Sequence, residues 1–220
     1  MLKVVVFDSG YGGESFADLL EESVPILEVI RVIDWRNADK ILSSAKTARK
    51  IAEAALRPYI GKVDLVIFAN YLLTITSLKY FCHKYKNQKF IGLNLKKPDT
   101  FIKKDSIILA TKAVARTITF KKFIFQLNRR IKTIPLDDWP DKIDDGELSE
   151  TEIKNTLETF IPKDFNLQEI FLACSQFSDI KNELRRVFSH NLKIYDGFND
   201  TIRDTCKTLK IRGSLPKSKN

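Results

Sequence analysis

The chain has 220 residues, of which 44% are hydrophobic and 30% are charged, a composition typical of a globular protein with one sizeable domain or two small ones. No apolar run reaches the roughly 18 residues that a membrane-spanning helix needs, and the amino-terminal apolar run is too short for a signal peptide, so we expect a cytoplasmic protein without a membrane partner. The net charge of +9 comes from scattered basic pairs without a nucleic-acid-binding motif, which argues against a nucleic-acid partner and leaves an attraction for small anions.

Short apolar runs alternate along the chain with segments of helical pattern. The runs are apolar almost throughout, as expected of strands that helices cover on both faces, and the alternation favours parallel sheets. We expect strands at about 3–7, 27–33, 63–68, 89–93, 106–110, 131–135, 168–173 and 192–195, and helices near 13–22, 43–59, 74–86, 113–128, 148–160, 177–188 and 198–209.

A polar segment that contains a proline, "NLKKPDTFIKKDS" at 94–106, separates two similar halves of the chain. We therefore predict an α/β fold with two pseudo-symmetric lobes, each a mostly parallel sheet flanked by helices, with a cleft between them. The first lobe is expected to comprise 1–96 and 190–220, and the second 97–189. In sheets of this kind, ligands bind beyond the carboxyl ends of the strands.

The cysteines and histidines do not form a metal motif. The three cysteines, Cys82, Cys174 and Cys206, are too far apart for a CxxC pair, and their odd number argues against a disulfide framework. With only His83 and His190 beside them, we predict no metal site.

The first candidate motif is "VVVFDSGYGGESF", in which a buried strand runs into Asp8, Ser9 and a glycine-rich turn before a helix. Glycines let a backbone turn tightly and approach a ligand closely. The helix that follows would offer free N–H groups to an anion, with the Asp8 carboxylate beside it. The alternative is a plain strand-to-helix turn in which Asp8 caps the helix.

The second candidate motif is "LACSQFS", in which Cys174 closes an apolar strand just before a helix. That placement favours a thiolate, which acts as a base or a nucleophile. The alternative is a buried structural cysteine, which describes Cys82 and Cys206 better. An earlier stretch, "VIFANYLLT", parallels "IFLACSQFS" and carries Ala69 at the place of Cys174.

These motifs resemble those of glutamate racemases, within the aspartate/glutamate racemase superfamily. "FDSGYGG" resembles the family's FDSGxGG signature, "FANYL" and "ACSQFS" stand in place of its two cysteine motifs, and "ILATKAVART" resembles its ATxxTxxS segment. The resemblance implies two α/β lobes, no metal, no other cofactor, and a small anionic amino acid or dicarboxylate as ligand. Members often form homodimers, so the resemblance also allows a homodimer.

The resemblance carries roles over to particular positions. Cys174 matches the second catalytic cysteine, and Asp8 is the best candidate for a second base because it lies on the side of the missing first cysteine. Asp144, Asp145 and Glu147 compete for the place of a family glutamate. Substrate-binding roles are expected for Ser9, Asp34, Asn70, Thr111, Ser175 and Gln176.

The chain also departs from the family pattern. Ala69 replaces the first cysteine, Gln176 replaces a histidine, and the Pro-Tyr-Gly loop after Asp34 is absent. Because racemisation without a cofactor needs a base and an acid on opposite faces of the substrate, and an alanine supplies neither, we expect standard two-cysteine racemisation to be lost.

Four interpretations therefore remain, and whether the protein is an enzyme is open. The first is a racemase-like protein that binds a small acid in the cleft without catalysis. The second is a racemase with Asp8, or more weakly Thr74 or Tyr71, as second base. The third is a one-cysteine enzyme similar to arylmalonate decarboxylase, in which Cys174 protonates the carbanion left by loss of CO₂. The least favoured is a basic α/β protein that binds nucleic acid.

Overall fold

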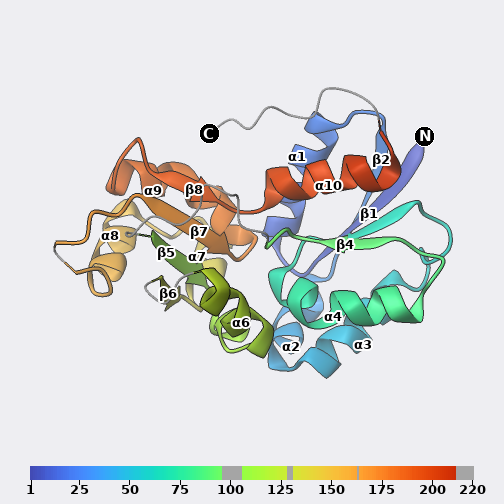
Figure 1. Ribbon diagram of the computed structural model, residues 1–220, viewed down its shortest axis with the longest axis horizontal. Helices are drawn as coiled ribbons and strands as arrows, with labels where there is room; N and C mark the ends of the chain where they lie inside the picture. The colour runs from blue at the N-terminus through green and yellow to red at the C-terminus, as the bar shows by residue number, and fades with distance from the viewer. Residues whose placement is uncertain (96–105, 128–130, 163, 212–220) are drawn as a thin grey trace. The chain divides into compact units, whose positions relative to one another are not determined.

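The computed structural model describes residues 1–95, 106–127, 131–162 and 164–211. The chain divides into two units, Met1–Leu95 with Gly197–Asn220 and Lys96–Asp196. Within the described ranges, each unit holds a four-stranded parallel sheet flanked by helices, so the predicted α/β class is confirmed (Figure 1).

The first unit is built on a sheet in the order β2-β1-β3-β4. Its strands are β1 (Leu2–Asp8), β2 (Leu27–Ile33), β3 (Leu65–Phe68) and β4 (Phe90–Gly92). Its helices are α1 (Tyr11–Ser23), the 3₁₀ turn η1 (Trp35–Asn37), α2 (Ala38–Ser43), α3 (Ala45–Leu56), α4 (Tyr71–Lys84) and α10 (Phe198–Leu209). All four residues of β3 are buried, because α1 and α10 cover one face of the sheet while α3 and α4 cover the other (Figure 1).

Aromatic side chains join the layers of the first unit. Phe16 of α1 meets Phe198 of α10 edge to face, with ring centroids 5.1 Å apart. On the other face, Phe68 at the end of β3 meets Phe81 of α4 at 5.0 Å. Such pairs contribute roughly 0.5–1.5 kcal/mol beyond the burial of their area.

The second unit repeats the topology with a sheet in the order β6-β5-β7-β8. Its strands are β5 (Ser106–Ala110), β6 (Lys132–Pro135), β7 (Glu169–Ala173) and β8 (Lys193–Tyr195). Its helices are α5 (Lys112–Ala115), α6 (Ile118–Leu127), α7 (Trp139–Asp144), α8 (Glu150–Glu158), the 3₁₀ segment η2 (Gln176–Ile180) and α9 (Lys181–Val187). Alternate residues of the strands, among them Leu109 and Leu172, pack with Trp139, Leu157 and Leu184 of the helices in one apolar cluster.

The boundary between the units lies further along the chain than predicted near residue 190. Strand β8 pairs with β7, with Ile194 opposite Ile170, so it belongs to the second sheet. Asp196 then forms an ion pair with Lys181 of α9. Because the short run at 192–195 gives no sign of its partner strand, its sheet could not be chosen from the sequence, and the placement of 190–196 in the first lobe was wrong.

Two other differences concern helices. The helix predicted at 113–128 is two helices, because Thr117 breaks it: its hydroxyl donates to the carbonyl of Val114 and accepts from the amide of Phe120. The helical segments at 35–43 and 139–144 were not predicted, since they are too short to show a helical period.

Glu53 of α3 is the centre of a polar cluster that ties α3 to α4. Its carboxylate accepts hydrogen bonds from Lys84, Tyr85 and Tyr80. The hydrogen bond from Lys84, followed by that from Tyr85, lowers the pKa of Glu53. A carboxyl group whose pKa is lowered on folding contributes stability above its unfolded pKa, and that contribution is lost as the pH falls through its folded pKa.

We therefore expect Glu53→Gln to lower the free energy of unfolding by about 1 kcal/mol at pH 7. The deficit relative to wild type should shrink as the pH falls below the ordinary glutamate pKa of about 4.3. Urea unfolding at pH 7 and at lower pH measures the difference in free energy of unfolding between the variant and the wild type. Glu28→Gln is the control, because Glu28 forms an exposed ion pair with Lys3. A deficit for Glu53→Gln that is independent of pH would contradict this role.

Candidate functional site

The carboxyl ends of β1 and β3 bring Asp8 and Asn70 together. Asp8 ends β1 and is only 1% exposed. Its Oδ1 accepts hydrogen bonds from the backbone amide of Ser9 at 2.6 Å and from Nδ2 of Asn70 at 2.8 Å. The structure therefore joins three of the predicted site residues, although Asn70 lies 62 positions from Asp8 in the sequence.

The side chain of Asn70 is oriented from both ends. Its Oδ1 accepts from the backbone amide of Leu73 at 3.0 Å, which caps the start of α4. Its Nδ2 is thereby directed to Asp8 and lies 3.5 Å from the hydroxyl of Ser9. A single amide thus fixes a helix, a carboxylate and a turn with respect to one another.

Gly13 allows α1 to approach the end of β1. A Cβ atom at this position would lie 2.3 Å from Cβ of Asp8 and 2.9 Å from Cδ1 of Ile33, so only glycine fits here. The alternative in which Asp8 caps the helix is not seen, because the N-cap of α1 is Gly10 and no side chain caps that helix.

Asp34 lies at the same edge of the first sheet, after β2. Its backbone amide donates to the carbonyl of Asp8 at 2.9 Å. Its half-buried carboxylate accepts from Nδ2 of Asn37 at 3.0 and 2.9 Å. Sequence reasoning did not identify Asn37, although the Asp-x-x-Asn spacing within a turn is a signal that would have suggested this contact.

The other polar candidates near β3 hold the backbone. The Thr74 hydroxyl donates to the carbonyl of Phe68 at 3.3 Å and accepts from the amide of Leu93 at 3.2 Å. Tyr71, the other weak candidate for a second base, is only 2% exposed and therefore buried. These contacts favour a structural role for Thr74, which joins the ends of β3 and β4.

In the second unit, Thr111 follows β5 and is buried. Its Oγ1 accepts from the amide of Val114 at 3.4 Å and caps α5. Next to it, the amide of Lys112 donates to Oδ1 of Asp137 at 2.6 Å. Thr111 therefore lies at the strand edge where the resemblance expects a substrate-binding residue, with its hydroxyl used as a helix cap.

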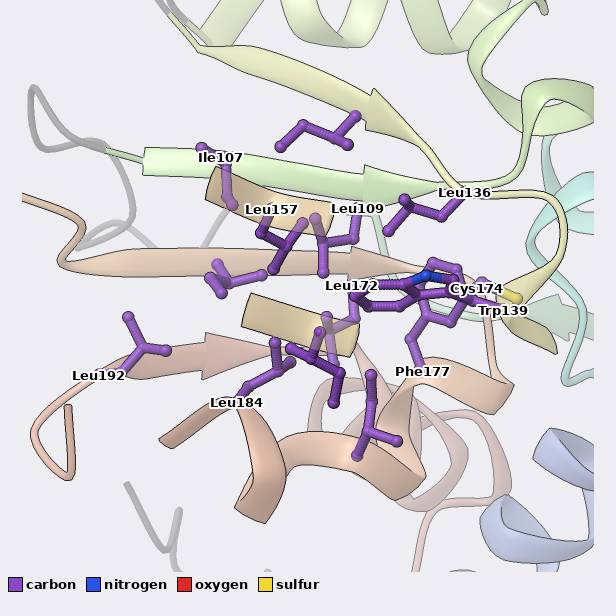
Figure 2. Close-up of a cluster of buried hydrophobic side chains, with 14 residues drawn as sticks. Ile107, Leu109, Leu136, Trp139, Leu157, Leu172, Cys174, Phe177, Leu184 and Leu192 are labelled. Atoms are coloured by element: carbon purple, nitrogen blue, oxygen red, sulfur yellow. The ribbon is translucent and has the colours of Figure 1, made fainter. Parts of the chain in front are cut away.

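Cys174 follows β7 and joins the apolar cluster of the second unit, where it lies beside Trp139 (Figure 2). It is 8% exposed. Its sulfur donates to Oε1 of Gln176 at 3.2 Å, and the buried hydroxyl of Ser175 donates to the same oxygen at 3.3 Å. The Cys174 thiol therefore acts as a hydrogen-bond donor to a neutral side-chain amide just beyond β7.

Ala69 and Cys174 occupy equivalent positions in the two sheets. Ala69 directly follows β3, and Cys174 directly follows β7, which has the same place in its own sheet order. Ala69 is wholly buried, and its amide donates to the carbonyl of Phe7 at 2.9 Å. One strand end therefore presents a methyl group where its counterpart presents a thiol.

No protein-family model matches the chain. Among curated proteins it is similar to the glutamate racemase of Clostridium botulinum, with 25% identity over 217 residues, 95% of this chain and 84% of the relative. The glutamate racemase of Buchnera aphidicola is also 25% identical, over 90% of this chain and 81% of the relative.

Solved structures agree with these relatives in fold. Escherichia coli glutamate racemase, in complex with L-glutamate and an activator, matches with a TM-score of 0.81 and 20% identity over 100% of this chain and 86% of the other. Picrophilus torridus aspartate racemase matches with a TM-score of 0.62 and 15% identity over 97% of this chain and 95% of the other. The chain is therefore similar to glutamate racemases along most of its length and shares its fold with members of the aspartate/glutamate racemase superfamily.

These similarities confirm the resemblance that the motifs suggested and the predicted two-unit α/β fold. Asp144 and Asp145 lie at the end of α7, with Glu147 two residues beyond, and the place of the family glutamate stays open among the three. Among the described residues, no three His, Cys, Asp or Glu side chains are grouped to hold a metal ion. In the same ranges, no helix is long and apolar enough to cross a membrane.

We expect Gly13→Ala to displace Asp8, because the new methyl group would overlap its Cβ. The free energy of unfolding should fall by roughly 1–3 kcal/mol, as in other overpacked sites. The NMR signal of the Ser9 amide, which donates to Asp8, should shift in the same variant. Gly146→Ala is the control, since Gly146 has a φ of +70° with no atom near the new methyl group, and it should leave the Ser9 signal in place. An unmoved Ser9 signal in Gly13→Ala would contradict the packing.

Proposed function

We propose that this chain is a racemase-like protein that binds a small amino or dicarboxylic acid at the carboxyl ends of its strands and has lost two-cysteine racemisation. The observation that carries this proposal is the contrast between the equivalent positions Ala69 and Cys174. The curated relatives are glutamate racemases, and the E. coli structure holds L-glutamate, which supports an amino dicarboxylic acid as ligand class.

The edge of the first sheet has groups that suit an amino acid. The carboxylates of Asp8 and Asp34 give this edge negative charge, which favours an ammonium group. The start of α1 lacks a side-chain cap, and such a helix end favours a carboxylate through its N–H groups and dipole. Both charged groups of an amino acid are thereby complemented within one unit.

The chemistry of racemisation explains why Ala69 matters. One group must remove the α-proton from one face while another returns a proton to the opposite face. The methyl of Ala69 does neither. Asp8 is the remaining candidate for a second base, but its Oδ1 already accepts from Ser9 and Asn70, which favours a positioning role.

We expect L-glutamate, L-aspartate or succinate to raise the melting temperature of the wild-type protein. A ligand at 100 times its Kd stabilises the folded protein by about 2.7 kcal/mol.

Asp8→Asn and Asn70→Ala should each weaken binding of these acids roughly tenfold, as expected when a buried polar partner is removed. Titration calorimetry measures the Kd of each variant. Asp18→Asn is the control, which should bind as the wild type does, because Asp18 lies exposed on α1 beside Arg31. If none of the acids binds to the wild type, the proposed function is wrong.

A second candidate function is a one-cysteine decarboxylase, which the hydrogen bond donated by the Cys174 thiol favours, because the mechanism needs a proton donor at this position. In that reaction the bond between the α-carbon and one carboxylate breaks, CO₂ leaves, and its bonding electrons remain on the α-carbon. The thiol then gives its proton to that carbon, and the resulting thiolate regains a proton from water. An acid is needed on one face only.

The decarboxylase alternative predicts CO₂ release from a substituted malonate. Cys174→Ala should slow the release strongly, because the variant lacks the thiol that protonates the carbanion. Cys82→Ala should leave it unchanged, since Cys82 is exposed on α4. Circular dichroism checks that both variants fold. Release by Cys174→Ala at the wild-type rate would exclude this mechanism.

A further inference from the structure

Two large aromatic side chains are exposed side by side in the first unit. Tyr11 is 51% exposed and Trp35 is 42% exposed. Their ring centroids are 4.2 Å apart, with the planes inclined at 57°. Exposed large aromatic residues that cluster in this way are typical of surfaces that bind a ligand or a partner.

The aromatic pair of Tyr11 and Trp35 lies at the carboxyl edge of the first sheet. Tyr11 is the first residue of α1 and comes shortly after Asp8, the last residue of β1. Trp35 opens η1, directly after Asp34, whose amide donates to the carbonyl of Asp8. The pair therefore belongs to the same edge as the Asp8 and Asn70 contact.

The turns that carry the two rings are themselves held by packing and hydrogen bonds. Gly13 packs against Asp8 and Ile33, which fixes the first turn of α1 that carries Tyr11. In η1, the amide of Asn37 donates to the carbonyl of Asp34 at 3.2 Å while its side chain donates to the Asp34 carboxylate. A rigid aromatic surface binds with little loss of conformational freedom, which increases its contribution to affinity.

We propose that the aromatic pair selects acids that carry an aryl or bulky apolar group over the same acids without that group. This inference rests on the proposed function, because it concerns the same ligand. An aryl group gains from stacking on Tyr11 and Trp35.

The test compares succinate with phenylsuccinate, which differ by one phenyl group, by calorimetry on the full chain. Phenylsuccinate should bind about tenfold more tightly. Trp35→Ala and Tyr11→Ala should each bring this ratio close to one. Phe125→Ala is the control, because Phe125 is 64% exposed on α6 of the second unit, and it should keep the ratio.

Fluorescence gives an independent signal. The chain has two tryptophans, and Trp139 is buried in the second unit, so Trp139→Phe leaves Trp35 as the reporter. Phenylsuccinate should change the Trp35 emission at concentrations that match its calorimetric Kd. Emission that stays constant through saturation would overturn the inference.

Three other results of the binding experiments lead to different conclusions. If succinate binds and phenylsuccinate binds no more tightly, the inference is wrong and the proposed function stands. If neither acid binds, the proposed function fails and the inference fails with it. If Trp35→Ala converts a dimer to a monomer and leaves the ratio unchanged, the pair is a subunit contact, which also overturns the inference.

Discussion

The hydrogen bonds of the Asp8 carboxylate are the constraint on which the candidate site in the first unit depends. They join the end of β1 to the turn at Ser9 and, through Asn70, to the start of α4. This buried carboxylate has room only because Gly13 has no side chain. A buried charge that loses such partners costs several kcal/mol, so the turn, the helix start and the strand end are fixed together.

The second unit repeats this topology with different chemistry. The order β6-β5-β7-β8 matches β2-β1-β3-β4, so Thr111 follows the strand equivalent to β1 and Cys174 follows the strand equivalent to β3. Asp8 in the first unit thus corresponds to Thr111 in the second, and Ala69 corresponds to Cys174. The two strand ends of each pair are adjacent because the strands are hydrogen-bonded neighbours. Each unit therefore has a polar residue at the end of one central strand, and of the two equivalent positions at the neighbouring strand end only Cys174 is a thiol.

The sequence predicted the strands well and the contacts between site residues poorly. Leu65–Phe68 and Glu169–Ala173 are buried at every residue, and such strands appear in a sequence as unbroken apolar runs. The motifs also identified Asp8, Asn70 and Cys174 as candidates. No local pattern shows that Asn70 meets Asp8 across 62 positions, or that the thiol donates to a glutamine, because tertiary packing decides both.

The proposed loss of two-base racemisation is tested most directly with the wild-type protein and L-glutamate or L-aspartate in D₂O. Chiral chromatography follows the D-enantiomer, and NMR follows the α-proton. With a methyl group at Ala69 in place of a thiol, no D-enantiomer should form beyond the level of a sample without protein. Conversion to equal amounts of the two enantiomers, with deuterium at the α-carbon, would contradict the loss of racemisation and would require a second base in place of the missing cysteine.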